Sequence, residues 1–203
     1  MGIADRKERE KKEMRELILK TATNLFIEKG YEKTSMRNIA EAIEYSPATI
    51  YLYFKDKNEL FYALSEEGFR KFFSYLGQVS DQINPIERLK ILGRAYVKFA
   101  LTHPGYYDLM FILRAPMETS HTETGWELGM KSHGVLTGIV ADCINDGHFK
   151  GKNPEQVAFM IWSLVHGIVS FKIRDRLKMY EDHDHDELLY GALDVFDTML
   201  ERI

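Results

Sequence analysis

The chain has 203 residues, of which 45% are hydrophobic and 29% are charged, and this balance is typical of a soluble globular protein. We expect neither a membrane span nor a secretory signal, because no apolar run is long enough and the first residues are highly charged. The single cysteine, Cys143, excludes an internal disulfide and fits the reducing cytoplasm, where we expect it to be a small buried side chain.

The net charge of −4 is unevenly distributed along the chain. Residues 1–57 contain 12 Lys and Arg against 10 Asp and Glu, a net charge of +2. Residues 58–203 contain 15 against 21, a net charge of −6. The basic excess favours nucleic-acid contact in the first segment, and the acidic remainder is expected to stay away from DNA.

The N-terminal segment predicts one long helix. Residues 1–12 alternate acids and bases without an apolar face, so we expect a frayed start, and from about Lys12 to Lys29 apolar residues recur at helical spacing. Gly30 is typical of the residue that follows a helix. The alternative for residues 1–12 is an arm whose basic side chains touch DNA phosphates or a minor groove. These side chains are Arg6, Lys7, Arg9, Lys11 and Lys12.

Residues 35–57 predict two short helices joined by a tight turn. Apolar residues from Met36 to Ile43 recur at i, i+3, i+4 and i+7, and Thr34 or Ser35 can cap this first helix. Glu44 and Tyr45 form the turn, and a left-handed conformation at Glu44 would cost about 1 kcal/mol.

The second of these helices starts with Ser46 as N-cap and Pro47 at the first helical position. It is expected to bury Ile50 and Phe54. Its opposite face presents small and hydrogen-bonding side chains, which suit the floor of a DNA major groove, and they are Ala48, Thr49, Tyr51 and Tyr53.

From Thr34 to Lys57 the pattern Thr-Ser-x-x-x-Ile-Ala-x-Ala-x-x-x-Ser-x-Ala-Thr-Ile-Tyr-x-Tyr-Phe-x-x-Lys resembles the DNA-binding signature of the TetR family of bacterial transcriptional repressors. The family usually has Gly in the turn, where this chain has Glu44. The residues matched to DNA contact are Thr34, Ser35, Arg37, Ser46, Pro47, Ala48, Thr49, Tyr51, Tyr53 and Lys57.

The next helix is expected to link the DNA-binding unit, residues 1–57, to a second domain, residues 58–203. Asp56 and Glu59 have the spacing of a capping box. Lys57 would then lie at a helix N-terminus, where a phosphate meets both a cation and free N–H groups.

Further helices are expected after Asn84-Pro85, after His103-Pro104, from about Trp126 to Asn145, after Asn153-Pro154 and after the acidic loop near residues 181–186. The helix that follows Asn153-Pro154 is apolar nearly all round, so it needs partners on several sides. No segment has the pattern of a strand, and the expected fold class is all-α. The segments 103–111 and 162–167 resemble the regulatory domain of a TetR subgroup with a Trp…His-Gly signature.

The sequence contains no Gly-rich phosphate loop, no Gly-x-Ser-x-Gly and no His-Glu-x-x-His motif, so we expect no enzyme and no cofactor. His183 and His185 could bind a metal, but a solvated loop is the expected state.

An aromatic set is the candidate for binding a small hydrophobic effector, because it carries more hydroxyl and N–H groups than a plain core needs. Its members and their neighbours are Phe69, Phe73, Tyr96, Phe99, Tyr106, Tyr107, Met110, Phe111, Trp126, Trp162 and His166. The alternative is plain core packing, with His166 as a satisfied core histidine.

The resemblance implies a cytoplasmic homodimeric repressor that binds a palindromic DNA operator and is released by a small hydrophobic or aromatic effector. The last two helices would form the dimer interface, with Val169 and Phe196 in it. One alternative is a regulator of the same fold that activates transcription or has no ligand. The other is an all-helical enzyme with an aromatic pocket.

Overall fold

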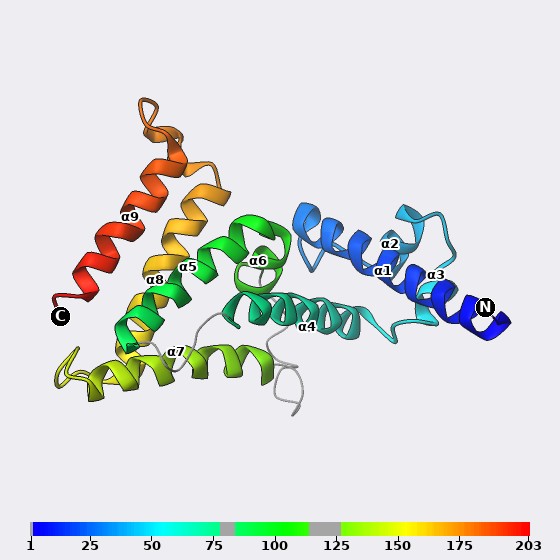
Figure 1. Cartoon of the computed structure of the whole chain (residues 1–203). Coiled ribbons are helices and arrows are strands. Elements are labelled where there is room, and N and C mark those ends of the chain that lie inside the picture. Colours follow the sequence, from blue (N-terminus) through cyan, green and yellow to red (C-terminus); the bar gives the residue numbers. More distant parts are fainter. Residues whose placement is uncertain (1, 78–83, 114–126) are drawn as a thin grey trace. The chain divides into compact units, whose positions relative to one another are not determined.

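The computed structural model describes residues 2–77, 84–113 and 127–203, and no strand occurs among them. The expected all-α fold class is confirmed (Figure 1). The helices are α1 (Ile3–Lys29), α2 (Met36–Ala42), α3 (Pro47–Tyr51), α4 (Lys57–Leu76), α5 (Pro85–Thr102), α6 (Pro104–Phe111), α7 (Glu127–Asn145), α8 (Pro154–Ile173), a 3-10 helix η2 (Arg176–Met179) and α9 (His185–Leu200).

Helix starts follow the expected capping signals. Asn84 Oδ1 accepts the Ile86 N–H at 2.8 Å at the start of α5. Asn153 Oδ1 accepts the N–H groups of Glu155 and Gln156 at 2.9 and 3.2 Å at the start of α8. Each bond satisfies a backbone donor that the first helical turn leaves without an intrahelical partner, and this fixes where the helix begins.

The helix start expected at about Lys12 is wrong, because α1 begins at Ile3. The alternating charges that gave no apolar face form ion pairs one turn apart, with nitrogen–oxygen distances of 3.4 Å for Arg6–Glu10 and 3.7 Å for Arg9–Glu13. Such pairs stabilise an exposed helix by about 0.2–0.5 kcal/mol each.

The described residues divide into two compact units. Unit 1 contains residues 2–69 and 105–113, and unit 2 contains residues 70–77, 84–104 and 127–203. The helix α4 contributes its first part to unit 1 and its last turns to unit 2. The domain boundary expected after residue 57 therefore falls within unit 1.

The core of unit 1 brings α1, α2, α3 and the first part of α4 together. Its fully buried side chains include Phe26, Ile39, Ile50 and Leu60. Rings cluster at its centre, with Phe61 edge-on to Tyr31 at 5.2 Å between ring centres. This core holds the short helices α2 and α3, which are too short to be stable in isolation.

Unit 2 packs α5, α7 and α8 against one another, and α9 lies alongside α8 and α5 (Figure 1). Two ion-pair groups join α5 to the end of α9. Lys90 Nζ lies 2.5 Å from Glu201 Oε1, and Arg94 donates to Asp197 Oδ2 through both Nε and Nη2, at 3.0 and 2.6 Å. Arg94 Nη2 also donates to Asp194 Oδ1 at 2.6 Å. The hydrogen bonds to Glu201 and to Asp194 are the largest causes that raise the pKa of Lys90 and of Arg94, respectively.

The helix α8 buries one face and exposes another. Ile161, Val165 and Val169 are buried within unit 2, whereas Phe159 is 65% exposed. By length and composition α8 could cross a membrane, which is weak support for a span because core helices of soluble proteins pass the same test. The neighbouring helix α9 also exposes an apolar side chain, Val195, which is 62% exposed.

Candidate functional site

The turn between α2 and α3 lies at Glu44, where the sequence predicted it. Glu44 has a φ of 60°, in the left-handed region, and Ser35 caps α2 by accepting the Asn38 N–H at 3.2 Å. Ser46 caps α3 by accepting the Thr49 N–H at 3.3 Å, and Pro47 occupies the first turn. Glu44 therefore tolerates the strain that a Gly would avoid at this position.

One side of α3 is buried and the other is open. Ile50 and Phe54 face the core of unit 1, as expected. On the open side Tyr51 is 55% exposed and Leu52, just past the end of α3, is 80% exposed. Leu52 is a candidate contact that sequence reasoning missed, although its distance of three residues from Thr49 places it on the same face.

The other expected DNA contacts differ in how open they are. Ser46, Pro47 and Ala48 are exposed, whereas Thr49 and Tyr53 are half-buried. The hydroxyl oxygens of Ser46 and Thr49 lie 3.0 Å apart, so the first turn of α3 presents a paired hydroxyl group.

Thr34 and Arg37 mark the inner and outer sides of α2. Thr34 is 1% exposed. Its hydroxyl lies within hydrogen-bond distance of two carbonyl oxygens, those of Leu25 (3.1 Å) and Gly30 (2.9 Å). In this structure it therefore links the end of α1 to α2. Arg37 lies on the open side, where its Nε is 3.0 Å from Glu41 Oε1.

Lys57 lies at the start of α4, as expected, and is held by Tyr31. Its ammonium donates to the Tyr31 carbonyl oxygen at 2.9 Å and lies 4.0 Å from the centre of the Tyr31 ring. Burial raises the pKa of the Tyr31 phenol to about 12, so this ring is neutral at physiological pH. The expected capping box is formed in part, because Asp56 Oδ1 accepts the Glu59 N–H at 2.8 Å.

The aromatic set expected to bind an effector is divided between the two units. Phe69, Tyr106, Tyr107, Met110 and Phe111 belong to unit 1, and Phe73, Tyr96, Phe99, Trp162 and His166 belong to unit 2. Trp126 lies outside the described residues. The members in unit 1 pack closely, with Phe69 edge-on to Phe111 at 6.1 Å.

In unit 2 the set forms a chain of polar contacts inside an aromatic core. Trp162 Nε1 donates to the Tyr96 hydroxyl at 3.4 Å, and this hydroxyl lies 3.0 Å from His166 Nδ1. Which of the two atoms donates in the Tyr96–His166 contact depends on the tautomer of the His166 ring. Burial lowers the pKa of His166, which favours the neutral imidazole.

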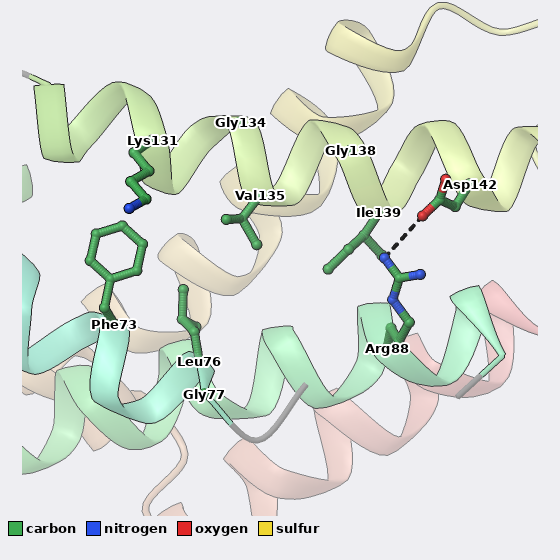
Figure 2. Close-up of a pocket in the computed structure, with 10 residues that line it drawn as sticks. All are labelled: Phe73, Leu76, Gly77, Arg88, Lys131, Gly134, Val135, Gly138, Ile139 and Asp142. Atoms are coloured by element: carbon green, nitrogen blue, oxygen red, sulfur yellow. Dashed lines mark hydrogen bonds and ion pairs between the residues drawn. The ribbon is translucent and has the colours of Figure 1, made fainter. Parts of the chain in front are cut away.

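Unit 2 also contains an open cavity of about 480 Å³ between the end of α4, α5 and α7 (Figure 2). Figure 2 shows Val135 and Ile139 pointing from α7 toward Leu76 of α4. Of the expected effector residues that the structure describes, only Phe73 lines this cavity. The described lining residues are Phe73, Leu76, Gly77, Arg88, Lys131, Gly134, Val135, Gly138, Ile139 and Asp142.

Two further sequence candidates have structural roles. Within residues 2–77, 84–113 and 127–203, no three His, Cys, Asp or Glu side chains group closely enough to hold a metal ion. Asp184, between His183 and His185, caps α9 by accepting the N–H groups of Asp186 and Glu187 at 2.8 and 3.0 Å. Burial raises the pKa of the Cys143 thiol to about 11, so it is protonated and unreactive.

Comparison with known proteins was made with both family profiles and individual chains. A profile described as bacterial regulatory proteins, tetR family, matches residues 18–64. A second, described as tetracyclin repressor-like, C-terminal domain, matches residues 89–196, more than half of the chain. Together they cover both the α1–α3 region and most of unit 2.

Individual relatives agree with the profiles. An HTH-type transcriptional regulator of Staphylococcus aureus (strain USA300) is 36% identical over 70 residues, which are 34% of this chain and 38% of that protein. The match therefore spans well under half the length of this curated relative. It supports the family at sequence level only for part of the chain.

Two solved structures share the fold over nearly the whole length. A protein of unknown function from Rhodococcus sp. RHA1 is 25% identical, covers 92% of this chain and 94% of its own, and has a TM-score of 0.68. A bacterial regulatory protein in the tetR family from Rhodococcus RHA1 is 22% identical, covers 92% and 96%, and has a TM-score of 0.73.

Proposed function

The chain belongs to the TetR family of bacterial transcriptional regulators, and from this premise we propose that it is a cytoplasmic, homodimeric repressor that binds a palindromic DNA operator. A small hydrophobic or aromatic effector releases it from the operator. The observation that carries the proposal is the open face of α3. The opposite face of this helix is buried in the core of unit 1 and fixes its position. Small side chains, hydroxyls and the exposed Tyr51 occupy the open face, and the excess of positive charge lies in the same part of the sequence.

The residues near α3 fall into two classes by chemistry. Thr49, Tyr51 and Leu52 offer hydrogen bonds and apolar contact to base edges, which carry sequence information. Arg37 and Lys57 offer cations, which position the protein on phosphates without reading sequence. Loss of the first class should alter specificity, and loss of the second should weaken all DNA binding alike.

The dimer proposal rests on the outer face of α8 and α9. Phe159, Met160 and Phe171 on α8 are exposed, as are Val195 and Met199 on α9. Several large exposed apolar side chains on two packed helices favour a protein interface. A two-fold dimer would also give one recognition helix to each half of a palindrome.

The effector proposal rests on the cavity of unit 2 and on α4. One wall of the cavity is formed by Phe73 and Leu76, in the last turns of α4. The first residue of the same helix is Lys57, in the DNA-binding unit. A ligand that favours one position of α4 would therefore bias the recognition helix and change its fit to a half-site.

Selection from a random double-stranded DNA library tests this function directly. The purified full chain should enrich duplexes that contain an inverted repeat, with two half-sites about one helical turn apart. An enriched single half-site would contradict the dimer. Absence of any enrichment at moderate salt would contradict sequence-specific DNA binding.

A further inference from the structure

We propose that the cavity of unit 2 binds an elongated apolar molecule with one negative charge, an alkyl or aryl carboxylate, whose charged end lies at Lys131. This inference rests on the proposed function, because it names the chemical class of the effector. The cavity of about 480 Å³ has the volume of ordinary small-molecule sites. All the lining residues that the structure describes belong to unit 2.

The inner wall of the cavity is apolar. Phe73 and Leu76 of α4 face Val135 and Ile139 of α7 across it (Figure 2). Binding is favourable when an apolar tail displaces water from such a wall. The apolar wall therefore accounts for the tail of the proposed ligand.

Two glycines widen the cavity on the α7 side. Gly134 and Gly138 are one helical turn apart, and both line the cavity. A Cβ added at either position would meet no atom within 4 Å. Glycine destabilises a helix interior relative to alanine, and the close packing of the chain does not require it here. Both glycines are exposed, so this side of the cavity is open to solvent and can admit an occupant.

The charges at the cavity favour an anion. Among the lining residues that the structure describes, Arg88 and Lys131 are cations and Asp142 is an acid. Arg88 Nη2 lies 3.0 Å from Asp142 Oδ2, so these two charges offset each other. Lys131 Nζ lies 5.6 Å from the centre of the Phe73 ring, next to the apolar wall. A carboxylate beside Lys131 would place its tail along Phe73 and Leu76.

Calorimetry with the full chain tests the ligand class through three probes of similar apolar content. Decanoate carries the charge, 1-decanol has the same chain without it, and 2-naphthoate replaces the chain by rings. We expect decanoate or 2-naphthoate to bind once per chain, and decanoate to bind up to about fivefold more tightly than 1-decanol, as expected for one exposed ion pair. The stronger of the two carboxylates identifies an alkyl or an aryl tail.

Lys131→Met tests the charge while keeping the length of the side chain. It should remove the preference for decanoate over 1-decanol and leave 1-decanol binding unchanged. Lys150→Met, at an exposed lysine that does not line the cavity, is the matched control and should change neither. An equal preference in wild type and Lys131→Met would overturn the assignment of the charged end.

Gly138→Leu tests the location. The leucine should fill the cavity and reduce the affinity for every probe at least tenfold, while helix content and thermal midpoint stay at or above those of wild type, because leucine is the better helix former. Undiminished binding in a folded Gly138→Leu protein would overturn the site. Failure of all three probes to bind wild type would overturn the ligand class, and it would leave the DNA selection experiment, and so the proposed repressor, unaffected.

Discussion

The ammonium of Lys57 donates a hydrogen bond to the carbonyl oxygen of Tyr31 at 2.9 Å while lying over the ring of the same residue. This contact joins the first residue of α4 to the segment between α1 and α2, 26 positions earlier in the chain. Lys57 therefore has a structural role in unit 1 besides the phosphate contact proposed for it.

Replacing Lys57 by Met separates these two roles. Loss of the hydrogen bond to Tyr31 should lower the free energy of unfolding by about 1 kcal/mol. If Lys57 also contacts phosphate, the variant should bind operator and random DNA more weakly by the same factor, and the slope of log affinity against log salt should flatten by about 1. If the variant is less stable but its salt slope is unchanged, Lys57 has only the structural role and does not contact phosphate. Lys150→Met is the control.

The dimer prediction requires exposed positions. Val169 and Phe196, which the sequence assigned to the interface, are buried within a single chain, so Asp at either would unfold the protomer. Phe159→Asp and Val195→Asp instead change exposed side chains on α8 and α9. We expect both to give folded monomers in sedimentation at micromolar concentration and to lose operator binding. Met130→Asp, on exposed α7 surface (65%), is the matched control, and a wild-type monomer would contradict the interface.

Stability should fall as the solution becomes acidic because of His166. Burial lowers its pKa below the ordinary value of 6.5, so the unfolded chain binds the proton more readily than the folded one. The stabilisation is complete above pH 6.5 and is lost as pH falls through the lowered pKa of the folded state. His103 acts in the same direction, through burial and then Lys71.

Unfolding in denaturant at about pH 7.5 and about pH 5.5 measures the effect, and His166→Gln should reduce the difference between the two free energies. His103→Gln should reduce this difference in the free energy of unfolding further. Identical differences in wild type and His166→Gln would show that this histidine does not contribute.

Coupling between effector and operator should pass through α4, which both units share. Operator DNA should weaken decanoate binding by the same factor by which decanoate weakens operator binding, typically about 5- to 150-fold. Arg70 is an exposed residue on α4, in unit 2 at its boundary with unit 1. Arg70→Gly should loosen the helix and reduce this factor, whereas Arg70→Ala, which keeps helix propensity, should preserve it. Equal reductions in both variants would contradict transmission through the rigidity of α4.

Helix positions could be predicted from the sequence because their signals are local. Asn84-Pro85 and Asn153-Pro154 are adjacent residues whose side chains cap the turn they begin. The turn at Glu44 and the buried face of α3 were predicted for the same reason. The N-terminal ion pairs are also local. The prediction of the helix start relied on an apolar face, which residues 1–12 lack, and it therefore placed the start too late.

The cavity could not be predicted because it depends on contacts between distant segments. Tyr96 and Phe99 belong to a periodic aromatic stripe that packs as core, and periodicity does not distinguish a core from a pocket. Gly134 and Gly138 give no signal of a cavity in the sequence, because a glycine within a helix does not show what lies beside it. Their value as open space became visible once α4 and α7 were placed on either side of it.

The most direct test of the central claim, that α3 reads an operator, is the affinity for a selected operator relative to random DNA. We expect Thr49→Ala and Tyr51→Ala each to weaken operator binding by about 1–3 kcal/mol while leaving binding to random DNA nearly unchanged. Thr102→Ala, the same change at an exposed residue of α5, should alter neither. Wild-type operator affinity in both the Thr49→Ala and Tyr51→Ala variants would contradict the assignment of α3 as the recognition helix.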